Sequence, residues 1–322
     1  MIEWLESRLG LRSAWTSATT RLTRPLPAGA GYRVTLGVAA ATILLVQCCT
    51  GALLALYYTP TLDGAHDSVA VITQELRFGW LARSLHVWGM HLLVGILLLH
   101  LLAEFVRGSY RAPREMIWVA GVVLFAVIAA GVFTGQVLPM DQEAYQGLKI
   151  AGATAGPLGP LVIGSRDPTD ATMMRFFVAH ILLIPAAFIG LLVLHALLVG
   201  RHRLHGATAE TSGDPTFLAR CATASLVTIA ALAILAFAWP KGLEPKADFT
   251  KSIAESKPLW LFLPLYQAKK MGPVEWFVLF GVPLLLVALP FLDRGQSRRL
   301  TLIAGFIVIT AVAALGVMGA TS

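Results

Sequence analysis

Four histidines lie in two apolar stretches of this chain, at spacings that place them on one face of a helix. His86 and His100 are fourteen residues apart, and His180 and His195 are fifteen apart. Each interval is about four helical turns, so the two rings of a pair lie roughly 21 Å apart along the axis. Histidine is a common axial ligand of haem iron. Two such helices facing each other would therefore hold two haems, one above the other.

The composition is that of a membrane protein. The chain has 322 residues, of which 57% are hydrophobic and 13% charged, and its mean hydropathy is +0.72. These values exclude an ordinary soluble domain. Apolar runs long enough to cross about 30 Å of hydrocarbon predict an all-α transmembrane fold with seven helices. The runs are 34–56, 81–106, 117–138, 176–199, 217–239, 274–292 and 300–318.

Residues 1–33 precede the first run and have a different character. They are amphipathic and contain no continuous apolar core of the kind found in a cleavable signal. Trp4, Leu5 and Leu9 alternate with charged residues such as Arg8, which indicates a short helix lying on the membrane surface. A frayed tail is the alternative interpretation.

Arginine is concentrated in alternate loops, which predicts the orientation of the spans. The arginine-rich loops lie on the side of the N-terminus, so we expect the N-terminus to be cytoplasmic in a multi-pass protein of a bacterial-type inner membrane. Six lysines in the 240–273 loop weaken this bias. The net charge of +7 fits contact with a lipid surface, and nothing in it calls for nucleic acid.

Glycines repeat the histidine interval on the two neighbouring spans. Gly37 and Gly51 are fourteen residues apart in the first span, as are Gly121 and Gly135 in the third. A flat porphyrin inside a helix bundle needs the backbone to come close, and glycine leaves that space open. Any one of these glycines could serve helix packing alone. Their shared interval favours contact with haem.

Short motifs around the first three spans carry a family resemblance. The first span contains Gln-Cys-Cys-Thr-Gly at 47–51, and the second begins with Gly-Trp-Leu-Ala-Arg-Ser-Leu-His at 79–86. The third is flanked by Pro-Arg-Glu at 113–115 and by Thr-Gly-Gln-Val-Leu-Pro at 134–139. These motifs resemble cytochrome b of the Rieske/cytochrome b (bc-type) quinol-oxidising complexes.

The seven-span length and the fifteen-residue interval resemble the chloroplast-type branch of that family. In that branch the four-helix haem subunit and the three-helix subunit IV are separate chains. The resemblance implies that the two are fused here, with residues 34–205 as the dihaem four-helix cytochrome b domain and residues 206–322 as the subunit IV-like domain.

The resemblance also implies which histidines share a haem. It pairs His86 with His180 near the outer side and His100 with His195 near the cytoplasm. The topology gives the same pairing, because the second and fourth spans both run inward. Both cofactors would be non-covalent haem b, since the position that carries the cysteine of a covalent third haem in some members is Thr35 here.

Two arginines match positions that hold haem propionates in the family. Arg83 resembles the partner of the outer haem, and Arg114 resembles the partner of the inner haem. Snorkelling of a long basic side chain at the membrane interface would explain either residue equally well.

The function implied by the resemblance is that of a quinol-cytochrome c reductase-like complex. The chain would be its dihaem subunit, carrying electrons across the bilayer between outer and inner quinone sites, with coupled proton translocation. The implied partners are quinone, a Rieske iron–sulfur protein, c-type cytochrome subunits, membrane lipid and a second copy in a homodimeric complex.

One departure from the family bears on catalysis. The family carries Pro-Glu-Trp-Tyr in its outer quinol pocket, whereas this chain has Pro-Leu-Trp-Leu at 258–261, so that Leu259 occupies the position of the acid. Leucine cannot accept a proton. Glu143, at a position where the family has an apolar residue lining that pocket, is a candidate replacement. The alternative for Glu143 is a solvated loop carboxylate.

Two other functional classes compete with this interpretation. A dihaem membrane anchor would pass electrons between the quinone pool and a redox partner other than a Rieske protein. A transporter without a cofactor would need interrupted helices at mid-membrane and would show no haem spectrum.

Overall fold

The computed structural model describes residues 31–164, 167–203, 217–250, 257–293 and 297–321. Within these ranges the chain is almost wholly helical, and its only extended pairing is an isolated bridge between Asp141 and Lys246. The all-α prediction is therefore confirmed. The predicted surface helix falls in residues 1–33, of which all but the last three lie outside the described ranges.

Seven helical stretches of the described residues are long and apolar enough to cross a membrane, as the sequence predicts. Their ends differ from the predicted ones by a few residues, because helices extend past their apolar runs and fray at their ends. The spans are α3 (Gly31–Ala55), α5 (Gly79–Arg107), α6 (Glu115–Gln136), the continuous α9 (Asp170–Val178), η2 (Ala179–Leu183) and α10 (Ile184–Arg203), α11 (Phe217–Ala238), the continuous α13 (Val274–Trp276), η5 (Phe277–Gly281) and α14 (Val282–Leu292), and α15 (Arg298–Thr321).

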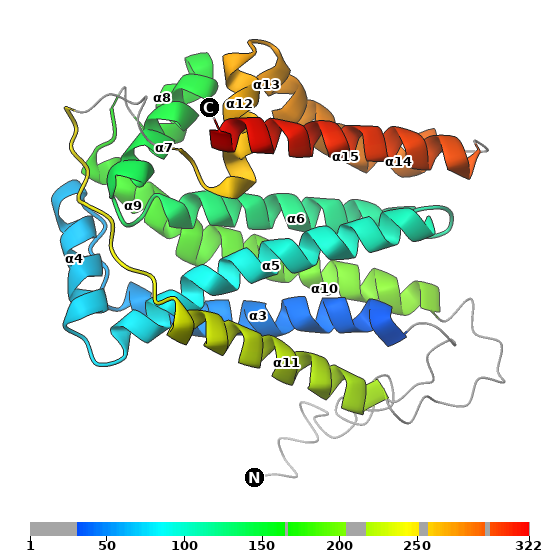
Figure 1. Ribbon diagram of the computed structural model, residues 1–322, viewed down its shortest axis with the longest axis horizontal. Helices are drawn as coiled ribbons and strands as arrows, with labels where there is room; N and C mark the ends of the chain where they lie inside the picture. The colour runs from blue at the N-terminus through cyan, green and yellow to red at the C-terminus, as the bar shows by residue number, and fades with distance from the viewer. Residues whose placement is uncertain (1–30, 165–166, 204–216, 251–256, 294–296, 322) are drawn as a thin grey trace, which may run out of the picture.

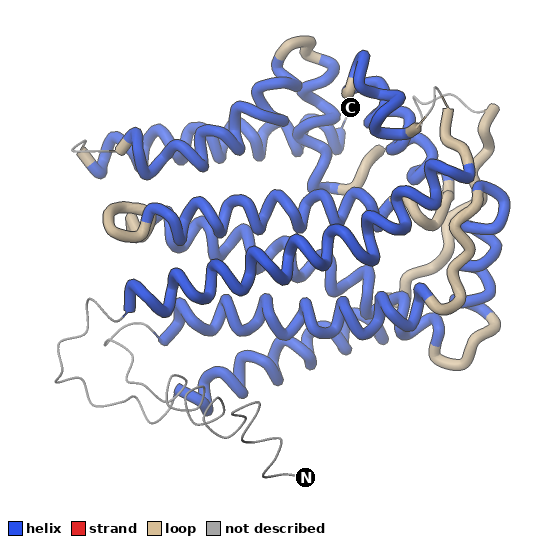
Figure 2. Tube along the Cα trace, turned by 180° about the vertical axis from the view of Figure 1, so that it is seen from behind, coloured by secondary structure: helices blue, strands red, loops and turns tan. Residues whose placement is uncertain are grey.

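Four of the spans form a central bundle. Helix α3 packs against α5, and α6 packs against α10 (Figure 1). Helix α11 lies along α3 and α5, whereas α14 lies along α6, and the two views place α11 and the pair α14 and α15 on opposite sides of the bundle (Figures 1 and 2). An apolar core fills the middle of the bundle; its buried members are Ala40, Ile43, Leu93, Val94, Leu124, Ile128, Val132 and Phe188.

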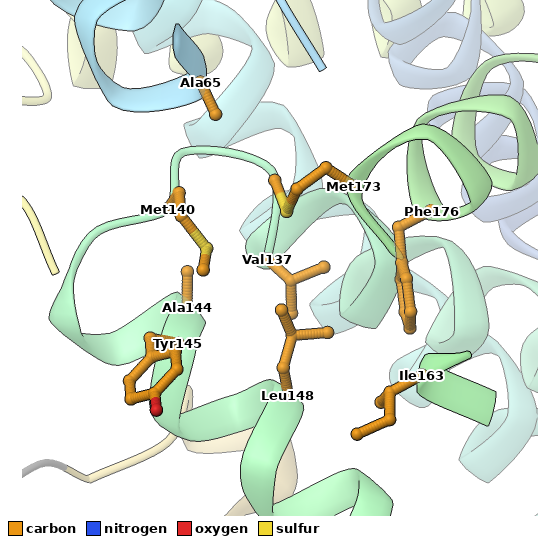
Figure 3. Close-up of a cluster of buried hydrophobic side chains, with 9 residues drawn as sticks. All are labelled: Ala65, Val137, Met140, Ala144, Tyr145, Leu148, Ile163, Met173 and Phe176. Carbon is orange, nitrogen blue, oxygen red and sulfur yellow. The ribbon is translucent and has the colours of Figure 1, made fainter. Parts of the chain in front are cut away.

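Shorter helices gather at the end of the bundle where α3 ends and α5 begins, which we call the capped end (Figure 1). Asp141 accepts a hydrogen bond of 2.9 Å from the Ala144 amide and so caps the start of α7. A buried apolar cluster packs α7 against the turn after α6 and against α9 (Figure 3). The short helices are α4 (Leu62–Gln74), α7 (Gln142–Thr154), α8 (Gly159–Ile163) and α12 (Leu263–Lys270). The cluster consists of Ala65, Val137, Met140, Ala144, Tyr145, Leu148, Ile163, Met173 and Phe176.

Each of the two segmented spans contains a π-turn that ends two residues before a proline. η2 precedes Pro185, and η5 precedes Pro283. Proline has no N–H to donate and its ring crowds the carbonyl four residues back, so the preceding turn widens. Four regular turns take about 14.4 residues. The widened turn at η2 therefore absorbs the extra residue between His180 and His195, and both stay on one helix face.

A buried carboxylate joins two loops at the other end of the bundle. The side chain of Asp293 is 1% exposed and accepts hydrogen bonds from Tyr110 Oη at 2.6 Å, Arg111 Nε at 2.8 Å and Thr301 Oγ1 at 2.8 Å. Burial alone would raise the pKa of Asp293, but these hydrogen bonds hold it below its ordinary value. The cluster ties the loop after α5 to the loop before α15.

Replacing Asp293 with asparagine is expected to lower the free energy of unfolding by about 2 kcal/mol, because the charge-assisted hydrogen bonds become neutral and a donor loses its acceptor. Thermal denaturation of the purified complex in detergent measures the effect. The matched control Thr301→Val removes one donor and leaves the carboxylate with its bonds to Tyr110 and Arg111, so it should cost less, about 1 kcal/mol. An unchanged midpoint for Asp293→Asn would show that the carboxylate does not stabilise this end.

Candidate functional site

The rings of His86 on α5 and His180 on η2 face each other across the bundle. Their centroids are 6.1 Å apart and their planes are inclined by 77°. Imidazole nitrogens bind transition-metal ions at about 2.0 Å, so two rings on opposite sides of one iron have centroids about 6 Å apart. The separation therefore fits a single iron bound by both histidines.

Hydrogen bonds at Nδ1 orient these two rings. His180 Nδ1 lies 3.1 Å from the Gly131 carbonyl, which can only accept, so Nδ1 carries the hydrogen. His86 Nδ1 lies 3.0 Å from Thr50 Oγ1, and the Thr50 hydroxyl itself donates to the Val46 carbonyl at 2.7 Å, so His86 Nδ1 is again the donor. Both rings therefore keep the Nε2 lone pair free for a metal.

A threonine precedes the glycine on each of the two neighbouring helices. Thr50 precedes Gly51 on α3, and Thr134 precedes Gly135 on α6, where Thr134 Oγ1 lies 3.2 Å from His180 Nδ1. Sequence reasoning identified the glycines but not these hydroxyl groups. The repeated Thr-Gly pair was the signal that could have found them.

The glycines leave room that any side chain would fill. A Cβ added at Gly135 would lie 2.5 Å from His180 Cε1, and one added at Gly51 would lie 3.1 Å from His86 Cε1. Neither position tolerates even alanine without displacing a ring. These contacts give the glycines a steric role beside the histidine pair at the capped end.

The second pair lies at the other level of the bundle. His100 lies on α5 and His195 on α10, and both side chains are half-buried. A Cβ added at Gly121 would lie 3.4 Å from His195 Cε1, whereas one added at Gly37 would have nothing within 4 Å. Three of the four predicted glycines therefore lie against a histidine ring, whereas a Cβ at Gly37 would have no neighbouring atom within 4 Å.

The Gly131 carbonyl that contacts the His180 ring belongs to the residue four positions before Gly135. That carbonyl already accepts the helical hydrogen bond from the Gly135 N–H, and its second lone pair is reachable because the glycine has no side chain.

The two arginines predicted as propionate partners differ in their surroundings. Arg83 is buried at the start of α5, and its Nη1 donates to the Lys241 and Gly242 carbonyls, both at 2.8 Å. Arg114 is exposed at the N-terminus of α6. Arg83 thus ties the start of α5 to the segment that follows α11, and a propionate role for either residue stays a prediction.

Glu143 lies in the first turn of α7 at the capped end and is half-buried. Gln136 Nε2, at the end of α6, donates a hydrogen bond of 2.5 Å to Glu143 Oε1. Burial, followed by the negative charge of Asp141, raises the pKa of Glu143, although Lys241 and the Gln136 hydrogen bond oppose the shift. Glu143 is therefore not a freely solvated carboxylate.

Leu259 lies immediately before η4 (Trp260–Phe262) and is half-buried. It packs against the apolar core of the bundle together with Leu261 and Phe262. A carboxylate in this apolar contact would pay a desolvation penalty without a partner. The leucine at the position of the family's acid is thus matched to its surroundings.

Comparisons with known proteins agree with this architecture. The family model described as Cytochrome b/b6/petB matches residues 22–203. Cytochrome b of Rickettsia prowazekii is 30% identical, covering 92% of this chain and 80% of the relative. The cytochrome b subunit of menaquinol:cytochrome c reductase from Geobacillus thermodenitrificans is 32% identical, covering 64% of this chain and 97% of the relative. The solved structure titled Hyperthermophilic respiratory Complex III matches with a TM-score of 0.80 and 25% identity, covering 99% of this chain and 91% of that chain.

The family match covers more than half of the chain, and the match to the rickettsial cytochrome b extends over nearly all of it. The likeness to the respiratory complex structure extends over nearly the whole fold as well. The matches thus cover both the helices that carry the four histidines and the three spans that follow. By sequence and by fold, this chain belongs to the cytochrome b family.

Proposed function

We propose that the chain is the dihaem subunit of a bc-type quinol-oxidising complex and carries electrons across the bilayer. The observation that carries this proposal is the His86 and His180 pair, with ring centroids 6.1 Å apart and both Nδ1 atoms held by hydrogen bonds. His100 and His195 are the proposed ligands of the second haem. Gly51, and with it Gly37, Gly121 and Gly135, are the proposed haem contacts.

The protein's contribution is ligation, orientation and exclusion of water. Bound haem b supplies reversible one-electron chemistry. Thr50 and Gly131 hold the two outer rings in the tautomer that presents Nε2. The apolar core between the two histidine levels keeps water away from the path between them. Arg83 and Arg114 are the proposed propionate partners.

The capped end is the proposed site of quinol oxidation. A quinol releases two electrons and two protons when it is oxidised, so the pocket needs a proton acceptor. Glu143 is the proposed acceptor, because its raised pKa lies closer to neutrality than that of a free carboxylate. Asp141, Lys241 and Glu244 are the charged groups that act on it.

The proposed setting follows from the relatives and from the charge pattern. The Geobacillus relative belongs to a menaquinol:cytochrome c reductase, which supports quinone, a Rieske protein and c-type cytochrome as partners here. We propose a cytoplasmic N-terminus, which puts the capped end outside and would release the protons of quinol there. We also propose a homodimeric complex and a division into segments 1–33, 34–205 and 206–322.

A reduced-minus-oxidised spectrum of the purified complex, with haem quantified per chain, tests the proposal. Two b-type haems per chain are expected, both released by acidified organic solvent because neither is covalently attached. Absence of b-type haem would overturn the proposal. Co-purification of a multihaem or molybdenum subunit in place of a Rieske protein would instead assign the chain to the class of dihaem anchors.

A further inference from the structure

His91 is a histidine within a membrane span that the haem sites do not use. It lies five residues after His86 and therefore about 140° around α5, away from the haem-facing side. From the sequence alone it is interpreted as a packing or lipid-boundary residue. Ionisable side chains inside a membrane span are rare and mark functional sites, so its surroundings on the structure bear on function.

The structure pairs His91 with the altered motif at 258–261. Trp260 Nε1 donates a hydrogen bond of 2.8 Å to His91 Nδ1. An indole can only donate, so Nδ1 must carry the lone pair and the ring must be neutral with its hydrogen on Nε2. His91 therefore presents an N–H donor at Nε2 and has no free basic nitrogen.

Two tryptophans flank the His91 ring. The centroid of Trp88 lies 5.4 Å away, and that of Trp260 lies 6.5 Å away with its plane inclined by only 25°. The Trp88 indole is already engaged, since it donates to the Trp239 carbonyl at 2.7 Å. Among the described residues none accepts a hydrogen bond from His91 Nε2. The half-buried ring thus has one donor for which the described residues supply no acceptor.

The depth of His91 limits what can accept this hydrogen bond. α5 runs from Gly79 to Arg107, and His91 lies about 3 Å from the midpoint of the helix. The hydrocarbon core is about 30 Å thick, so the ester carbonyls of phospholipids lie about 15 Å away. An unpaired N–H is costly at that depth. An oxygen carried by a molecule that dissolves in the membrane interior can reach the donor at that depth.

We propose that His91 Nε2 donates a hydrogen bond to a carbonyl oxygen of a membrane-dissolved quinone, which docks on the lateral face of α5 beside Trp88 and Trp260. The inference rests on the proposed function only in taking quinone as the substrate. The planar head group stacks on the half-exposed indole of Trp260. Since His91 donates but cannot accept a proton in this state, the site binds the oxidised quinone and performs no proton transfer.

Two variants separate this role from a structural one. In His91→Gln the side-chain amide reaches the position of Nε2 and keeps a donor there. In His91→Asn the side-chain oxygen reaches the position of Nδ1 and keeps the acceptor for Trp260, but the donor at Nε2 is lost. If His91 has only a structural role, asparagine should preserve the wild-type behaviour better than glutamine. If His91 binds quinone, glutamine should preserve quinone binding better than asparagine.

The probes are a benzoquinone and a naphthoquinone, each with a short alkyl tail and carbon-13 at its carbonyls, added to the purified complex. We expect one carbonyl stretch to shift to lower frequency in the wild type and in His91→Gln, and to lose the shift in His91→Asn. Binding by His91→Asn should be about 3- to 10-fold weaker, the effect of one neutral hydrogen bond.

Either of two results would overturn the proposal. Full binding by His91→Asn with loss in His91→Gln would show that His91 only accepts from Trp260. Equal binding by all three proteins would show that the Nε2 donor is used elsewhere, for example by a helix of a partner subunit. Haem content is measured on the same samples. If the proposed function is wrong, every preparation lacks haem, whereas failure of the His91 inference leaves the haem content unchanged.

Discussion

The variant His180→Leu is expected to contain one haem b per chain in place of two and to lose quinol-dependent cytochrome c reduction altogether. Leucine cannot bind iron, and the facing ring of His86, 6.1 Å away between centroids, supplies only one of the two axial bonds. The electron path across the bundle would be interrupted at the capped end. Haem quantification in detergent and a steady-state assay measure the two effects.

The control for this prediction is His66→Gln. His66 lies on α4 at the same end of the bundle, and its ring contacts the Glu244 carbonyl at 2.8 Å. Its replacement changes a histidine of the capped end without touching the bundle, so both haems and the turnover rate should stay as in the wild type. Two haems in His180→Leu would refute the assignment of His180 as a ligand.

Glu143→Gln is expected to slow quinol oxidation by about two orders of magnitude, the typical contribution of a positioned proton acceptor. Glutamine keeps the size of the side chain, and its amide oxygen can still accept from Gln136, but it cannot take a proton. Haem binding should be unchanged. Quinol-dependent haem reduction followed by stopped flow measures the rate, and an unchanged rate would rule out Glu143 as the acceptor.

The pH dependence provides a second readout for Glu143. The acceptor must be ionised to work, and its pKa is raised by burial and by the charge of Asp141. The wild-type rate should therefore rise as the pH increases through that raised pKa, and it should fall below it. In Glu143→Gln this rise should disappear. Glu244→Gln, which removes an exposed carboxylate of the same end, serves as the control. It should keep the rise, moved slightly to lower pH because Glu244 contributes to the raised pKa of Glu143.

Most of the haem-site prediction could be made from the sequence, because the helical period is regular. His86, His100, His180 and His195 could be placed on helix faces from their spacing alone. The glycines at the same interval followed for the same reason. Fifteen residues in place of fourteen looked equivalent in the sequence, and the structure supplies the cause, a π-turn before Pro185 that absorbs the additional residue.

Contacts between distant segments were not accessible to the same reasoning. The Asp293 cluster joins residues more than 180 positions apart, and the Trp260 to His91 hydrogen bond joins residues 169 apart. No period or motif relates such positions. The tautomers of His86 and His180 also depend on partners on other helices, since the hydrogen on Nδ1 is assigned by what accepts it.

The sequence by itself thus determined the membrane class, the number of spans and the histidine faces, because these depend on composition and on a local period of 3.6 residues. Only the tertiary structure decided which nitrogen of the His180 ring is left free for a metal, that Leu259 packs against the apolar core, and that His91 accepts a hydrogen bond from Trp260. These features depend on which helices become neighbours, and hydrogen bonding between neighbours is fixed by packing.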